Sequence, residues 1–214
     1  MHISDYLNYS YYLLQGLRYT LEITLYSLII ATPLGLFWTF GRDSKYAIVR
    51  LVFGTVIDIS RGLPHLVLLF YVYFVFPEIG LNVTAVQAAV IGLSFAYSTY
   101  LAEIYRSGLE SVPKGQIEAA KSIGMTNALS MRRVVLPQAI RVVIPPYANI
   151  AVMVLKESSL ASTIAVGEMT REANLLVNST FDALTIYTLL AIFYLAFSIP
   201  LIHVTKYLEK RLKN

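Results

Sequence analysis

Residues 118–125 read EAAKSIGM, a short polar stretch between two long apolar ones in a chain that is 57% hydrophobic. Pro113 and Gly115 precede it and favour a break in a helix that arrives from the N-terminal side. Alanine favours helix, a carboxylate suits the first helical turn, and glycine is common just past a helix end. The sequence therefore predicts a short polar helix with Glu118 in its first turn and a cap at Gly124.

The composition around this stretch indicates a membrane protein. Only 14% of the 214 residues are charged, whereas a soluble domain carries about 25%. The chain has no cysteine, which excludes disulfides and thiolate metal sites. No Lys or Arg precedes Arg18, and Asp5 stands before the first apolar run, so we expect that run to be a retained span and not a cleaved signal peptide.

Five apolar stretches are long enough for a transmembrane helix, which needs about 20 residues. They are residues 17–40, 51–76, 85–107, 136–155 and 184–205. Helices satisfy every backbone group within the segment, which lipid requires. We therefore predict an all-α membrane protein with five transmembrane helices.

The basic residues predict the orientation of these spans. With the N-terminus outside, 13 of the 17 Lys and Arg residues fall in or beside the inner loops and the C-terminal tail. The outer stretch 156–183 holds two basic residues against four acids. Because basic loops stay on the cytoplasmic side, the sequence predicts an N-out, C-in topology with EAAKSIGM in the largest cytoplasmic loop.

The run from Glu118 to Pro137, EAAKSIGMTNALSMRRVVLP, resembles the EAA loop of ABC importer permeases, with Val134 where isoleucine is usual. The flanking AEIYRSGLESVPKGQIEAA and LPQAIRVVIPPYANIAVMVLKESSLAS resemble the polar amino-acid subgroup, whose members are of the histidine, glutamine and arginine type. SRGLPHLVLLFY resembles the subgroup's RGTPLLVQLF element, from which Leu63, His65 and Leu68 depart.

The resemblance implies a type I importer (MetI-like) permease fold in the cell membrane of a prokaryote, with residues 1–214 as one transmembrane domain. It also implies a cytoplasmic coupling helix around 116–125 that docks on an ATPase subunit. Coupling residues would be Glu118, Ala119, Ala120 and Gly124. Expected partners are ABC ATPase subunits, an extracytoplasmic substrate-binding protein and a second permease copy, which is either this chain again or a close relative.

No nucleotide-binding or catalytic motif accompanies this loop. The chain lacks a G-x-x-x-x-G-K-[ST] sequence, so we expect ATP and Mg²⁺ on the partner ATPase and no cofactor, catalytic residue or metal site in this chain. H-E-x-x-H and G-x-S-x-G sequences are also lacking, which leaves a membrane-embedded enzyme without support.

Three acids, Asp58, Glu103 and Glu157, fall within predicted spans, where a charge costs about 2.5–3.5 kcal/mol on insertion scales. One interpretation is a closed set of internal pairs: Asp58 with Arg61, Glu103 with Arg106, and Glu157 with Lys156. The other is that these carboxylates line a path and meet the amino groups of a passing amino acid. The candidate substrate-binding residues are Asp58, Arg61, Tyr97, Tyr100, Glu103, Leu155, Glu157 and Ser158.

The function best supported by the sequence is a permease for polar amino acids. The surplus of acids favours basic cargo such as arginine, lysine or histidine, and glutamine or another polar amino acid is the alternative. A secondary transporter or cation channel could use the same acids as an ion relay. The loop 118–137 favours the permease, because a channel has no need of it.

Overall fold

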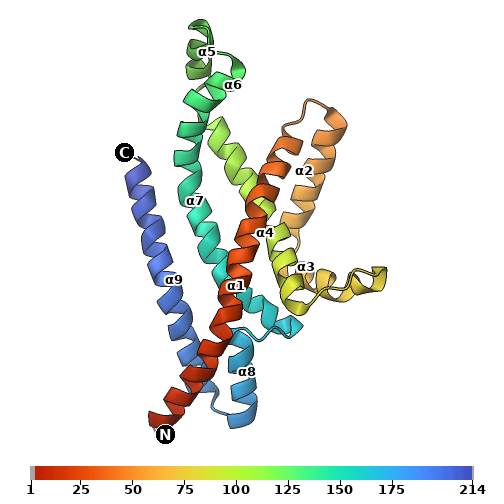
Figure 1. The fold of residues 1–214 in the computed structure, drawn as a ribbon, viewed down its shortest axis with the longest axis vertical. Helices are drawn as coiled ribbons and strands as arrows, with labels where there is room; N and C mark the ends of the chain where they lie inside the picture. Colours follow the sequence, from red (N-terminus) through yellow and green to blue (C-terminus); the bar gives the residue numbers. More distant parts are fainter. Residues whose placement is uncertain (1–2, 214) are drawn as a thin grey trace.

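The computed structural model describes residues 3–213, and these form helices and the turns between them (Figure 1). Several α-helices continue directly into short 3₁₀ or π segments, labelled η. The elements in chain order are α1 (Ile3–Arg42), α2 (Ala47–Gly62), α3 (His65–Phe70), η1 (Tyr71–Val75), η2 (Pro77–Ile79), α4 (Ala85–Glu110), α5 (Lys114–Ser122), α6 (Asn127–Ser130), η3 (Met131–Val135), α7 (Leu136–Glu157), η4 (Ser158–Ile164), α8 (Met169–Thr180) and α9 (Ala183–Lys213).

Four of the described helices are long and apolar enough to cross a membrane, and one bent pair passes the same test only when its two parts are taken together. The four are Asp5–Arg42, Ala85–Glu110, Asn127–Ile164 and Ala183–Leu212. The longest helix, α1, has 40 residues and is about 60 Å long, twice the thickness of the hydrocarbon core. The predicted all-α class is confirmed, and the five crossings are reached if the bent pair counts as one.

The second predicted span, residues 51–76, is wrong as a single helix. The chain bends by 106° between Ala47–Gly62 and His65–Ile79. Leu63 is extended, with φ −94° and ψ 141°, because the ring of Pro64 disfavours helical backbone in the residue before it. The Pro64 carbonyl then accepts the Val67 amide at 2.9 Å and opens α3.

Helix α4 is the centre of the fold, with α1, α2, α3 and α7 packed around it. Glycines let two of these neighbours come close. A Cβ on Gly92 would lie 2.9 Å from Leu69 of α3, and one on Gly108 would lie 2.4 Å from Val143 of α7. The main buried core lies between α4 and residues of α1, α3, α7 and the 3₁₀ segment η4.

A second, smaller core lies at the end of the molecule that holds the N-terminus and α8 (Figure 1). Here α8 packs on α1 at Gly16, where a Cβ would lie only 2.6 Å from the amide nitrogen of Met169. Leu13, Met169 and Ile186 are fully buried in this core. The α1–α2 turn and α5 lie at the opposite end of the molecule (Figure 1).

The polar stretch forms α5, but the helix begins earlier than predicted. It starts at Lys114 after Pro113, whose φ of −58° suits a helix entry. Glu118 therefore lies in the second turn, and the prediction of a first-turn position is wrong. The reason is that Gly115, expected to belong to the break, is accommodated within the helix.

The predicted end of α5 is confirmed. Gly124 has a φ of +85°, the left-handed conformation that glycine adopts at little cost. Its amide donates to the Lys121 carbonyl at 2.9 Å, and the Met125 amide donates to the Ala120 carbonyl at 3.1 Å. This pair of hydrogen bonds is a Schellman motif, which satisfies the last carbonyls of the helix.

Candidate functional site

Glu103 on α4 lies among three arginines from three helices. Arg42, the last residue of α1, donates a hydrogen bond to Oε1, and Arg106 donates to Oε2 at 2.9 Å. Nη1 of Arg61 on α2 is 3.8 Å from Oε1. The predicted Glu103–Arg106 pair is confirmed, while the other two partners come from distant parts of the chain. Together with Asp58, these residues form what we call the Glu103 cluster.

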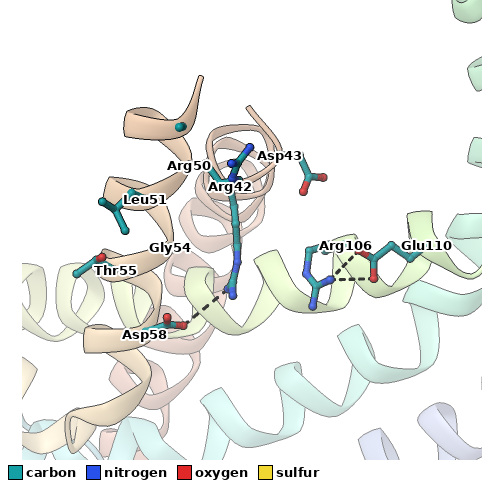
Figure 2. A pocket seen from close by; sticks show the side chains of 10 residues that line it. Arg42, Asp43, Arg50, Leu51, Gly54, Thr55, Asp58, Arg106 and Glu110 are labelled. Atoms are coloured by element: carbon teal, nitrogen blue, oxygen red, sulfur yellow. Dashed lines mark hydrogen bonds and ion pairs between the residues drawn. The ribbon is translucent and has the colours of Figure 1, made fainter. Parts of the chain in front are cut away.

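Asp58 does not pair with Arg61, so that predicted ion pair is wrong. Its Oδ1 lies 3.8 Å from Nη1 of Arg42, which reaches across from the end of α1 (Figure 2). Arg61 faces Glu103 instead. A contact at i,i+3 on a helix surface contributes only a few tenths of a kcal/mol, so packing between helices decides which partners meet.

A pocket of about 680 Å³ opens beside the Glu103 cluster, between the end of α1, α2 and α4 (Figure 2). Its lining is Arg42, Asp43, Ala47, Arg50, Leu51, Gly54, Thr55, Asp58, Arg106 and Glu110. Arg106 is also held by Glu110 at 2.7 Å. Three arginines and three acids line this space, so the pocket favours neither sign of charge.

A second polar group lies around Glu157, at the C-terminal end of α7. Oε2 of Glu157 is 2.5 Å from Nδ1 of His65, the first residue of α3. The His65 ring lies 5.1 Å from the Tyr97 ring and 5.7 Å from the Tyr100 ring, centroid to centroid. The predicted Glu157–Lys156 pair is wrong, because the histidine takes the carboxylate. We call Glu157, His65, Tyr97 and Tyr100 the Glu157 site.

Arg61 connects the Glu103 cluster to the Glu157 site. Its guanidinium lies over the Tyr100 ring, 5.2 Å from the centroid, while Nη1 faces Glu103. About two fifths of the Arg61 side chain (39%) and a third of the Glu157 side chain (33%) are exposed. A cationic and an anionic group therefore reach the open surface near the same tyrosine.

The Tyr97 hydroxyl is buried without a hydrogen bond of normal geometry, and it faces the Glu157 carboxylate. Tyr97 itself is fully buried in the core. The Glu157 carboxylate therefore has two polar neighbours in this site, His65 and Tyr97.

Glu168 is a buried acid that we did not assign to any site from the sequence. It caps α8: its carboxylate accepts the amides of Thr170 at 2.9 Å and Arg171 at 2.8 Å. The Tyr194 hydroxyl of α9 donates to it at 3.0 Å. Burial raises the pKa of Glu168 to about 6, against these hydrogen bonds, which lower it. An acid directly before a helical stretch is an N-cap signal that could have found it.

Residues 3–213 contain no group of three or more His, Cys, Asp or Glu side chains placed to hold a metal ion. The polar groups described so far are instead paired ions and aromatic rings on membrane-spanning helices. Such groups at membrane depth are typical of transport paths.

Comparison with known proteins identifies the family. The profile described as "binding-protein-dependent transport system inner membrane component" matches residues 31–214. The chain belongs to this family. It is an inner-membrane permease, as the resemblance of the EAA loop predicted.

The sequences of known relatives match this permease along nearly its whole length. It is 44% identical over 185 residues to the probable amino-acid ABC transporter permease YckA of Bacillus subtilis, covering 86% of this chain and 82% of the relative. It is 34% identical to the probable glutamine ABC transporter permease GlnM of the same organism, covering 97% and 95%.

A solved structure gives the same result for the fold. The crystal structure of an amino acid ABC transporter with histidines matches with a TM-score of 0.91 and 33% identity, covering 99% of both chains. The predicted type I importer (MetI-like) permease fold is confirmed.

The last two candidate path residues of the permease, Leu155 and Ser158, lie behind Glu157. Both are buried, and the Ser158 hydroxyl donates to the Leu155 carbonyl at 2.8 Å. The serine hydroxyl is therefore engaged within its own turn. The geometry brings Arg61, Tyr97, Tyr100 and Glu157 together and leaves Leu155 and Ser158 as packing beneath them.

The EAA segment of the permease lies at one end of the molecule (Figure 1). Glu118 and Ala119 are exposed on α5, whereas Ala120 is buried against its own chain. Ile123, just past the helix end, is 75% exposed. Of the two alanines assigned to coupling, only Ala119 lies on the open surface.

Proposed function

We propose that this permease forms, with a second permease copy, the path of an ATP-driven importer of polar amino acids, with cationic side chains favoured. The observation that carries the proposal is that Arg61 lies over the Tyr100 ring, while Glu157 pairs with His65, whose ring also contacts Tyr100. An amino-acid head carries both signs of charge, and Arg61 and Glu157 are partly exposed and of opposite sign. The face of a tyrosine ring adds attraction for a cation.

Glu157 is better suited than the other two acids to meet a cationic cargo. Asp58 and Glu103 already face arginines within the Glu103 cluster, so their charge is compensated. The partner of Glu157 is an imidazole, which a cargo ammonium or guanidinium can replace. A carboxylate bound to such a cation contributes more than a neutral hydrogen bond.

The names of relatives support both the proposed cargo and its alternative. The solved transporter at 33% identity is described with histidines, whereas the relative at 34% identity is named as a probable glutamine permease. Glutamine is therefore the second candidate cargo, and the choice depends on how much Glu157 contributes to binding.

The test is direct binding to the purified permease–ATPase complex without the substrate-binding protein, whose own selectivity would mask that of the path. Arginine and glutamine are titrated calorimetrically against the parent and Glu157→Gln. We expect the variant to weaken arginine binding about tenfold or more, because a hydrogen bond to a charged group contributes roughly 1.5–3 kcal/mol. Glutamine binding should change less than threefold. Equal arginine binding by both proteins would contradict a cationic cargo read by Glu157.

We further propose that α5 is the coupling helix and faces the cytoplasm, with ATP and Mg²⁺ bound by the ATPase. The exposed Glu118, Ala119 and Ile123 offer one charged and two apolar contacts at the end of the molecule. The basic loops support this orientation. The predicted partners are ABC ATPase subunits, a second permease copy and an extracytoplasmic binding protein.

Docking by α5 is tested with Glu118→Lys, which inverts a charge on the exposed face of the helix. We expect normal membrane insertion and loss of ATP-driven uptake in proteoliposomes that contain all partners. Glu78→Lys, on the 3₁₀ segment η2 far from α5 in the chain, is the matched control and should keep uptake. Normal uptake by Glu118→Lys would rule out docking through this face.

A further inference from the structure

His65 is the residue of the Glu157 site that departs from the pattern of the resembling family, where leucine is usual. It follows directly on the Leu63–Pro64 break, so the 106° bend sets the position of its side chain. The imidazole is largely buried, with 12% exposed, and its Nδ1 lies 2.5 Å from Glu157. The bend therefore brings a side chain of the second crossing against the end of α7.

The imidazole occupies the place that a cationic cargo group would take. It contacts one carboxylate oxygen of Glu157 and lies edge-on to Tyr100 and tilted against Tyr97. These are the contacts that a guanidinium or ammonium group would make: a charge-assisted hydrogen bond and aromatic faces. The Tyr97 hydroxyl is the other polar neighbour of Glu157, without a hydrogen bond of normal geometry.

We propose that His65 is a specificity-determining residue that weakens the preference of the Glu157 site for cationic side chains. A cation must compete with the imidazole for the carboxylate, whereas a neutral polar side chain needs only the remaining oxygen. A protonated imidazole acts in the same direction, because it adds a positive charge beside the incoming one. This inference rests on the proposed cargo site and adds which residue sets its selectivity.

The experiment compares arginine with glutamine in the same binding assay, with permease–ATPase complex and no substrate-binding protein. His65→Leu keeps apolar packing against the two tyrosines and removes the hydrogen bond. We expect the ratio of arginine to glutamine affinity to rise about tenfold, since Glu157 then has no internal competitor. His65→Met should act in the same direction and replaces the leucine variant if that variant does not assemble.

Two control variants isolate the hydrogen bond. His65→Gln retains an amide donor toward Glu157 and should keep the ratio within about threefold of the parent, because a neutral donor preserves part of the competition. His203→Leu removes an exposed histidine on α9, whose Nδ1 lies 2.8 Å from the Ile199 carbonyl of the same helix, and should leave the ratio unchanged.

The outcomes separate this inference from the proposed function. A ratio that stays constant or falls in His65→Leu and His65→Met, while Glu157→Gln weakens arginine binding, overturns the role of His65 and leaves the cargo site standing. A parent complex that binds neither arginine nor glutamine would instead overturn the proposed function.

Discussion

The Glu103 cluster and the α5 segment are held together in opposite ways. In the cluster, Arg42, Asp58 and Glu103 come from three helices and are up to 61 residues apart in the chain. In α5, every bond that ends the helix joins residues within five positions of one another, such as the Met125 amide and the Ala120 carbonyl. The first region depends on how helices pack, whereas the end of α5 depends on its own sequence. Elsewhere on α5, Gln116 also accepts a hydrogen bond from Gln138 of α7 at 2.5 Å.

This difference predicts how far the effect of a substitution spreads. Removing a member of the cluster leaves charges unpaired on several helices at once, so the whole fold should lose stability. A change at the end of α5 should be felt within this segment alone, because local elements open separately from the core.

The largest effect is expected for Glu103→Ala. Arg42, Arg61 and Arg106 would lose their shared carboxylate at a position where only a fifth of the Glu103 side chain (20%) is exposed. Breaking a buried ion pair costs 3–5 kcal/mol, and partial exposure places this site near the lower end, at about 3 kcal/mol. The melting temperature of the purified complex should fall by about 8 °C.

The matched control is Glu118→Ala on the exposed face of α5. Its effect on the free energy of unfolding should stay within about 0.5 kcal/mol, as for most surface substitutions. If both alanine variants lowered the melting temperature equally, the contrast between a packed cluster and a local helix would be wrong.

The same contrast explains which parts of the structure could be predicted from the sequence. Gly124 follows an alanine-containing polar helix, and this local signal correctly gave the end of α5. Span count and helix class also follow from apolar runs, which are local properties. The partners of Glu103 could not be derived, since Arg42 and Arg61 meet it only once α1 and α2 have packed on α4.

The bend in the second predicted span could have been predicted from the sequence, whereas the partner of Glu157 could not. The bend at Leu63–Pro64 has a local cause, and the proline in the second apolar run was a usable signal for it. The contact between His65 and Glu157 joins residues 92 positions apart and depends on the direction that the chain takes after that bend. A sequence pattern can indicate the break, but packing determines where the following side chain points.

Glu168 combines both kinds of contact. Local amides of α8 donate to its carboxylate, and Tyr194 donates to it from α9. Its pKa is about 6 in the folded chain, raised by burial from the ordinary value of 4.5. The folded chain therefore binds more protons than the unfolded chain between pH 4.5 and 6. Stability must fall as the pH rises through this window, by about 2 kcal/mol in total.

Thermal melting of the complex from pH 4.5 to 7 tests this prediction. Glu168→Gln has no titrating group at this position, so subtracting its curve removes the contribution of all other residues. The parent's melting temperature should fall by about 5 °C relative to the variant as the pH rises, and remain level above pH 6.5. If the parent's melting temperature instead rose relative to the variant as the pH increased, the capping hydrogen bonds would lower the pKa of Glu168 more than burial raises it.

The smallest effects should come from two glycines at the two ends of α5, and they should have opposite signs. Gly124 has a φ of +85°, which costs a residue with a side chain about 1–2 kcal/mol, whereas Gly115 lies inside the helix, where alanine gains roughly 0.5–1 kcal/mol. A Cβ at either position would meet nothing within 4 Å, so the backbone alone decides both signs.

Because α5 opens locally, hydrogen–deuterium exchange of residues 114–125 is the suitable measurement, and the melting temperature is not. Gly124→Ala should speed exchange in this segment about fivefold and Gly115→Ala should slow it, while exchange in α4 stays unchanged. A change in α4 exchange would show that α5 is coupled to the core of the isolated permease, and the separation between local and packed regions would then fail.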